Sequence, residues 1–213
     1  MAFTDYRCID DVLRKHKLRL IAEEVLPPAA DAPPFDEHFL REINLSLHYL
    51  RPGRSSEIGS GEIMLFPILR EVWKSYREDL CLFTHEELAY DDDLRGVPDY
   101  FVCPLSEYGR IPDVPYLLVA EAKMDDFDRA WGQCGAAMLA AQRLNQTPDV
   151  PVYGIATNGR AWEVGALLGC EFTLDQRSVA VGNMDTLGQT LHAVFRAVHA
   201  QAVAHVRTPT PTA

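Results

Sequence analysis

Two short apolar runs decide the fold of this chain: Val97–Val102 reads VPDYFV, and Leu117–Lys123 reads LLVAEAK. Each run has the length and composition of a β-strand, and each has charged residues at or near one end. Side chains alternate between the two faces of a strand, so Glu121 and Lys123 share a face. We therefore expect the carboxylates of Glu121 and Asp99 and the ammonium of Lys123 to lie together at one edge of a sheet. Such a group can hold a hard divalent cation and activate a water beside it.

The composition is that of a globular protein with one domain, or with one domain and a helical appendage. The chain has 213 residues, of which 47% are hydrophobic and 24% are charged. No apolar run is long enough to span a bilayer, and the first residues lack the layout of a secretory signal. The five cysteines are scattered and form no CxxC pair, which argues against a disulfide framework or a zinc knuckle and favours the cytoplasm.

The formal net charge of −11 is unusual for a protein that holds nucleic acid. Neutralisation of phosphates dominates such affinity, so this balance argues against tight, non-specific DNA binding. The basic clusters at 14–19 and at Arg51 with Arg54 are more typical of solvated helix faces than of phosphate-binding surfaces.

Local patterns predict the other elements. Residues 5–26 have the spacing of one or two short amphipathic helices, and the proline-rich stretch 26–34 predicts a linker or an extended arm over the surface. The remaining expected elements are, in chain order, a helix at 35–50, a helix from Ser55 to about Tyr76 with a kink or a late start because of Pro67, strands at 80–90, 98–102 and 116–122, a helix at 125–145, a hairpin around Asn158-Gly159, and a helix at 184–206.

This order predicts an α/β fold with a mixed central sheet and helices on both of its faces. We divide the chain into an N-terminal helical arm with its proline-rich linker (1–50), a core with the C-terminal helix (51–206) and a disordered tail (207–213).

The motifs resemble those of the PD-(D/E)XK nuclease superfamily, whose members have a restriction-endonuclease-like fold. Pro98-Asp99 lies in one expected strand, Glu121-Ala122-Lys123 ends the next, and the helix that follows contains Gln133. The matched part runs from about Ser55 to Val164. More narrowly, the segments 56–73, 96–100 and 121–127 resemble an uncharacterised bacterial group within that superfamily.

The resemblance implies a metal-dependent active site. Asp99 and Glu121 are the implied ligands of Mg²⁺ or Mn²⁺, together with the backbone carbonyl of Ala122. Lys123 is implied to orient or deprotonate the attacking water and to stabilise negative charge on phosphorus. These roles agree with the chemistry, because phosphodiester hydrolysis needs an in-line hydroxide and a cation that screens the developing charge.

Further site residues are expected on two helices. Glu62, or failing it Glu57, is expected to add a carboxylate from the first core helix. Glu62 is favoured because it shares a helical stripe with Leu65 and Leu69, which would point it into the fold. Gln133, about two turns into the helix after Lys123, is expected to hydrogen-bond the site or the substrate.

Each of these residues also has a purely structural interpretation. Asp99 after a proline fits a turn, and Glu121 with Lys123 fits an ion pair at a sheet edge. The glutamates of the first core helix and Gln133 fit solvated helical positions. The placement of the motifs on strands favours the functional interpretation for Asp99, Glu121 and Lys123, whereas both interpretations stay open for the helical residues.

Three functions are compatible with these observations. The first is a Mg²⁺-dependent nuclease, with DNA favoured over RNA as its substrate. The second is a catalytically silent module of the same fold that binds or assembles. The third is a nuclease subunit that relies on a partner for DNA recognition, which would reconcile an intact site with the acidic charge. A homodimer and a larger nuclease complex both fit, and no membrane partner is expected.

Overall fold

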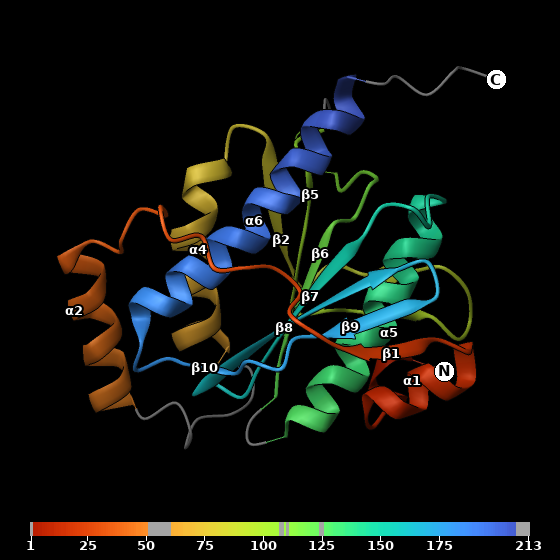
Figure 1. Cartoon of the computed structure of the whole chain (residues 1–213), viewed down its shortest axis with the longest axis horizontal. Coiled ribbons are helices and arrows are strands. Elements are labelled where there is room, and N and C mark those ends of the chain that lie inside the picture. Colours follow the sequence, from red (N-terminus) through yellow and green to blue (C-terminus); the bar gives the residue numbers. More distant parts are fainter. Residues whose placement is uncertain (1, 51–60, 107–108, 110, 124–125, 208–213) are drawn as a thin grey trace.

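A computed structural model describes residues 2–50, 61–106, 109, 111–123 and 126–207 of the chain. In these ranges the chain forms a mixed eight-stranded sheet with helices on both faces, and a separate two-stranded ribbon (Figure 1). The α/β class, the mixed sheet and the N- and C-terminal helices expected from the sequence are confirmed. None of the helices in the described ranges is long and apolar enough to cross a membrane.

The two strands that the sequence singled out are neighbours in the interior of the sheet. β5 (Tyr100–Pro104) pairs antiparallel with β6 (Leu118–Ala122), and β6 pairs parallel with β7 (Val152–Thr157). The strand order is β1-β9-β8-β7-β6-β5-β2, with β10 paired to β8. The other strands of this sheet are β1 (Arg19–Ala22), β2 (Leu80–Thr84), β8 (Ala161–Leu168), β9 (Glu171–Leu174) and β10 (Val179–Ala180).

The helices form a layer on each face of the sheet (Figure 1). One layer contains α5 (Phe127–Asn145), with α1 (Ile9–His16) packed on it. The other contains α4 (Phe66–Trp73) and α6 (Met184–Arg207), and α2 (Glu37–Leu45) joins its core through the buried Ile43. Four short turns complete the helical elements, namely 3₁₀ turns at Phe3–Asp5 and Lys74–Tyr76 and π-helical turns at Ser46–Leu50 and Gly61–Leu65.

The alternation of side chains along β6 supplies both layers. Leu118, Ala120 and Ala122 are buried in the core beneath α4 and α6, whereas Val119 is buried in the core beneath α5. All five residues of β6 are buried, as expected for a central strand that is covered on both faces.

The helix α5 is almost completely buried, and small residues make this possible. At Gly132 a Cβ would lie 2.7 Å from the Tyr6 carbonyl oxygen and 2.7 Å from the Cys8 nitrogen. Only glycine allows the two backbones to approach so closely. The N-terminal segment therefore lies directly on the helix that follows β6, and it covers the core.

Two expectations about the strands were wrong. Arg19–Ala22 was expected within short helices, but it forms the edge strand β1, parallel to β9. The strand expected at 80–90 ends at Thr84, because His85 turns the chain with a φ of +53°. The remainder of that stretch contributes β3 (Leu88–Ala89), which pairs with β4 (Arg95–Gly96) in the ribbon. The short strands β9 and β10 were not expected.

Several other expectations are confirmed. Asn158-Gly159 lies in the turn between β7 and β8, with Gly159 at a φ of +81°. The proline-rich stretch forms neither helix nor strand, and it lies against α6 through the Ala29 amide, which donates to the Gln189 carbonyl at 3.0 Å. Pro67 lies in the first turn of α4.

Two parts of the expected organisation fall on residues that the structure does not describe. The start of the first core helix, 55–60, lies outside the described residues, and so does the expected tail apart from Arg207, the last residue of α6.

Candidate functional site

The two carboxylates that the sequence singled out stand beside each other where β5 begins and β6 ends. Tyr100 pairs with Ala120 in the antiparallel ladder, so the preceding Asp99 stands opposite Glu121. The Asp99 side chain accepts a hydrogen bond from the Ala122 amide at 2.8 Å. This contact fixes one carboxylate to the end of the strand that bears the other.

Lys123 completes the group. Its Nζ lies 3.4 Å from Glu121 Oε2 and 3.1 Å from the Ala122 carbonyl oxygen. The Lys123 amide donates to the Thr157 carbonyl at 2.9 Å, which ties the end of β6 to β7. Glu121 is 2% exposed and Lys123 is 9% exposed, so both side chains are withdrawn from water. The expectation that Asp99, Glu121 and Lys123 converge is therefore met.

The face of the sheet below Glu121 is covered by α5. Glu121 is in register with Ala156 on β7, which is in register with Glu163 on β8. From α5, the Trp131 indole donates to Glu163 Oε2 at 2.7 Å. The Cys134 thiol, also on α5, lies 3.8 Å from the Val119 carbonyl oxygen. These contacts seat the helix against the strands and keep bulk water from the side of Glu121 that faces it.

Burial makes the Glu121 carboxylate costly to ionise. Its pKa is raised from 4.5 to about 8, first by burial and then by the negative charge of Asp99, while Lys123 acts in the opposite direction. A divalent cation between the two carboxylates would favour their ionised forms. Glu121 is therefore mostly protonated near neutral pH, and a bound cation would shift it toward its ionised form.

The oxygen atoms at this edge fit magnesium or manganese. Asp99 and Glu121 offer carboxylates and Ala122 offers a carbonyl, and these are the hard ligands that Mg²⁺ prefers. Among the described residues, no three acidic, histidine or cysteine side chains gather into a metal cluster. Two carboxylates suffice for Mg²⁺, because this ion usually keeps several of its waters.

Glu62 does not point into the fold as expected. It is exposed, while Leu65 and Leu69 are buried. The reason is the π-helical turn at Gly61–Leu65, which widens the helix and shifts its phase, so the three residues do not share a stripe. Glu62 is nevertheless close enough to Tyr100 to contribute, after burial and Asp99, to raising the pKa of that hydroxyl to about 12. The alternative, Glu57, lies outside the described residues.

Gln133 is buried, not solvated. It is 4% exposed on α5, directly before Cys134, and its Nε2 atom has no hydrogen-bond partner among the residues that the structure describes. A buried amide donor without a partner costs roughly 1–3 kcal/mol, so it needs an explanation. A ligand that accepts this bond would provide one.

One residue beside the site was missed by sequence reasoning. The His85 amide donates to the Asp99 carbonyl at 3.0 Å, and its ring lies 5.8 Å from that of Tyr100. A left-handed backbone at a residue other than glycine is uncommon, and such strain occurs often at functional sites. No local pattern around His85 signals this geometry, because it depends on the pairing of β2 with β5.

Comparisons with known proteins leave the family of this chain open: no family model matches it, and a search of curated proteins found no match.

Proposed function

We propose that this chain hydrolyses phosphodiester bonds in nucleic acid with Mg²⁺ or Mn²⁺, and that DNA is the favoured substrate. The observation that supports this most is the contact of the Lys123 ammonium with Glu121 and with the Ala122 carbonyl, next to the Asp99 carboxylate. The combination of two carboxylates at one edge of the sheet with an ammonium suits cleavage at a phosphorus centre, because a cation site and a proton-handling group lie side by side.

Each side chain has a distinct role in this proposal. Asp99 and Glu121 hold the cation, and the Ala122 carbonyl adds a neutral oxygen. When bound, the cation acidifies a water and screens charge on the phosphate. Lys123 orients that water through its ammonium hydrogens and stabilises negative charge on the phosphate oxygens. Gln133 supplies a buried amide donor for the site or the substrate.

The resemblance to the PD-(D/E)XK superfamily agrees with this proposal. Asp99 immediately precedes β5, Glu121 and Lys123 end β6, and α5 follows after a short connection. The departure from the expected pattern is Glu62, whose exposure argues against a third inner-shell carboxylate.

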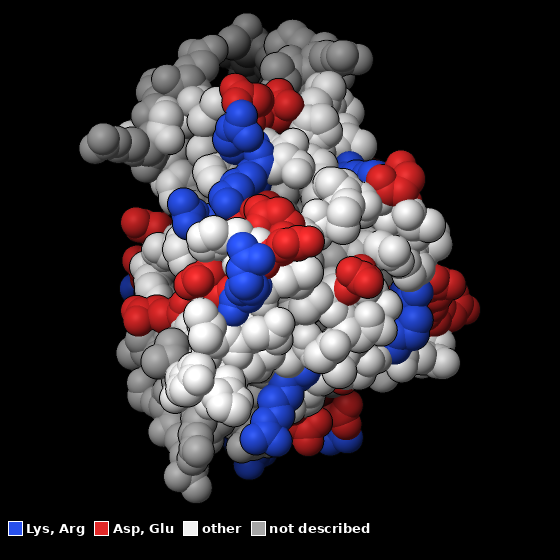
Figure 2. Space-filling view, turned by 90° about the vertical axis from the view of Figure 1, so that its left-hand side faces the viewer, with Lys and Arg blue, Asp and Glu red and all other residues white. Residues whose placement is uncertain are grey.

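A second candidate, a nuclease subunit that obtains its DNA through a partner, is favoured by the charge of the molecule. The formal net charge is −11. On the face that Figure 2 shows, basic and acidic side chains alternate in small groups, and the coloured residues form no continuous basic surface. Long-range attraction of DNA to such a surface is weak. A partner with a basic surface would supply the missing attraction, and a cytoplasmic location fits either candidate.

Cleavage assays with matched variants test the proposal. We expect the purified chain to cut DNA with Mg²⁺ or Mn²⁺ and not with EDTA. Lys123→Ala should abolish cutting, and so should Asp99→Asn, which keeps an oxygen to accept the Ala122 amide. Asp128→Asn changes an exposed carboxylate in the first turn of α5 and serves as the control.

Metal binding separates the catalytic proposals from a silent module. Titration calorimetry with Mn²⁺ should show a site that Asp99→Asn weakens and Asp128→Asn does not. If wild type and Asp99→Asn bind the ion equally, the carboxylates do not form a metal site. If the metal binds but DNA and RNA stay intact, the subunit that needs a partner becomes the better proposal.

A further inference from the structure

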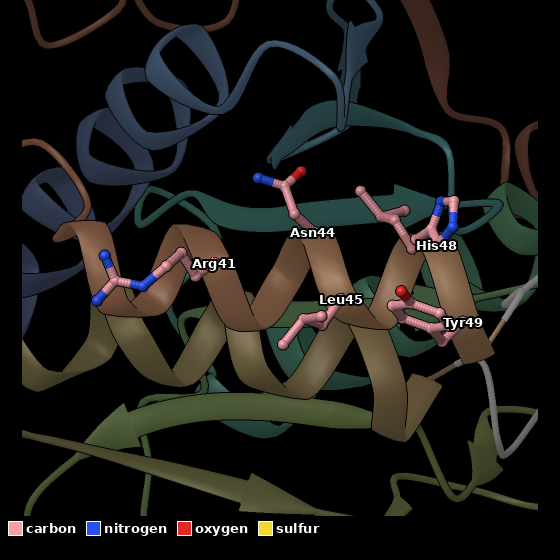
Figure 3. Close-up of a pocket in the computed structure, with 6 residues that line it drawn as sticks. Arg41, Asn44, Leu45, His48 and Tyr49 are labelled. Atoms are coloured by element: carbon pink, nitrogen blue, oxygen red, sulfur yellow. The ribbon is translucent and has the colours of Figure 1, made fainter.

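A groove of about 700 Å³ runs along α2 and the π-helical turn that follows it. Figure 3 shows its side chains spread along this segment, with Arg41 at one end and His48 and Tyr49 at the other. Among the described residues, six line the groove; five of them are exposed and none is acidic. The lining residues are Arg41, Asn44, Leu45, Leu47, His48 and Tyr49.

The aromatic end of the groove is unusually open to solvent. Tyr49 is 71% exposed, and its ring makes an edge-to-face contact with that of His48, with 4.6 Å between the centroids. A tyrosine held this way presents a flat apolar face to water without being part of a core. Stacking on such a face is how proteins hold unpaired bases of any sequence.

The polar side chains of the groove suit the remainder of a nucleotide. Arg41 offers a guanidinium to a phosphate, and Asn44 offers an amide to a base edge or a sugar. Arg41 is held by Glu37 at 3.6 Å, but both side chains are well exposed, so this ion pair is weak and can be exchanged. The volume lies within the range of roughly 300–1,000 Å³ that is typical of small-molecule sites, which leaves room for a nucleotide but not for a folded chain.

The groove is connected to the candidate site through two contacts. The turn Ser46–Leu50 packs on the turn Gly61–Leu65. A Cβ at Gly61 would lie 3.8 Å from the hydroxyl oxygen of Tyr100, the residue that follows Asp99. The turn at the aromatic end of the groove is thus linked by two packing contacts to Tyr100, the residue that follows Asp99.

We propose that this groove binds a single-stranded stretch of the nucleic acid whose phosphodiester is cleaved at Asp99, Glu121 and Lys123. The inference rests on the proposed function, and it adds a substrate class: nucleic acid with an unpaired segment next to the cleaved bond. Stacking on Tyr49 supplies a contact that does not depend on base sequence, and Arg41 supplies positive charge for the backbone. Tyr49 is the main contact, and Arg41 holds one phosphate.

Binding measured without metal tests the groove independently of catalysis. The probe is a fluorescein-labelled oligothymidylate of about 12 nucleotides, which fits the site sizes of single-strand binders, followed by anisotropy in EDTA. Tyr49→Ala should weaken binding by roughly 5- to 150-fold, the range that corresponds to the loss of one stacked base. Tyr49→Phe keeps the stacking face and should bind like the wild type.

The matched control is Tyr90→Ala in the turn of the β3–β4 ribbon, a tyrosine that is 49% exposed. The proposal for the groove is wrong if Tyr49→Ala and Tyr90→Ala lose the same affinity for the oligothymidylate, or if Tyr49→Ala loses none. Failure of the wild type to bind the oligothymidylate also overturns it, and binding of an apolar peptide in that case assigns the groove to a protein partner.

Cleavage with Mg²⁺ separates this inference from the proposed function. A tailed duplex should be cut with a lower KM than a blunt one, and Tyr49→Ala should raise the KM of the tailed duplex alone. If both duplexes are cut with the same KM and Tyr49→Ala changes neither KM, the nuclease proposal is supported and the proposal for the groove is wrong. If neither duplex is cut but Tyr49→Ala still weakens binding of the oligothymidylate, single-strand binding by the groove is supported and the nuclease proposal is wrong.

Discussion

Replacing Glu121 by glutamine should stabilise the protein at neutral pH, because glutamine keeps the size of the side chain and does not have to take up a proton when the chain folds. The pKa of Glu121 is raised from 4.5 to about 8. Between these values the unfolded chain binds fewer protons than the folded one, so wild-type stability falls as the pH rises. The stability that protonated Glu121 contributes is complete below pH 4.5 and is lost as the pH rises through 8.

The magnitude follows from the same two values. At pH 7 the raised pKa corresponds to roughly 3 kcal/mol of lost stability, most of which develops above pH 5. The free energy of unfolding of Glu121→Gln should therefore gain on the wild type by roughly 2–3 kcal/mol between pH 5 and pH 7. For a chain of this size that gain is a shift of about 1 M in the urea midpoint.

Urea denaturation at pH 5, 6 and 7 measures this difference, with Glu86→Gln, an exposed carboxylate, as the control. Surface substitutions of this kind change stability by less than about 0.5 kcal/mol. Added Mg²⁺ should reduce the difference in unfolding free energy between Glu121→Gln and the wild type, because it stabilises the wild type alone. At 100 times the dissociation constant this stabilisation is about 2.7 kcal/mol. A gap that does not depend on pH would refute the reasoning, because Glu121 would then not be a carboxylate held against its ionisation.

Three other predictions test separate features. Gly132→Ala should destabilise the protein by about 1–3 kcal/mol in urea denaturation, because its Cβ would meet the backbone of the N-terminal segment. Gly182→Ala should not, because a Cβ there would meet nothing within 4 Å among the described residues beyond its chain neighbours. Burial lowers the pKa of His192, whose Nδ1 lies 3.0 Å from the Tyr76 hydroxyl, so neutral His192 contributes stability above pH 6.5 that is lost as the pH falls. In His192→Asn the free energy of unfolding should therefore fall less steeply on acidification than in the wild type. Equal slopes in the two proteins would contradict this prediction. The net charge of −11 should make kcat/KM for DNA rise by a factor of about 2–10 when salt is added from low ionic strength to about 0.1 M, and a steep fall instead would indicate a basic binding surface.

The parts of the fold that follow from local patterns were predicted well. The alternation in Leu117–Lys123 predicted both the strand and the faces of its residues, because a central strand meets a core on each side. Asn158-Gly159 predicted the β7–β8 hairpin through its turn chemistry. The convergence of Asp99 with Glu121 followed from the placement of both residues near strand ends.

The predictions that were wrong concern features that depend on long-range contacts, which local sequence patterns do not indicate. The strand Arg19–Ala22 is short and largely exposed, so it has no alternating apolar signal and exists because β9 pairs with it. Glu62 was misplaced because a π-helical turn changes the phase of a helix that was read at 3.6 residues per turn. The degree of burial of Glu121, and hence its pKa, depends on α5 lying beneath it.

The pairing of β1 with β9 also sets the order in which the molecule can be completed during synthesis. Arg19 and its partner Glu171 are separated by 152 positions. A chain emerging from the ribosome at about 5–20 residues per second exposes β1 well before its partner strand exists. The contacts of Tyr6 and Cys8 with Gly132 form earlier, as soon as α5 has emerged. The N-terminal segment is thus made long before the strand β9 that β1 pairs with, and β1 is among the last elements to reach its final position.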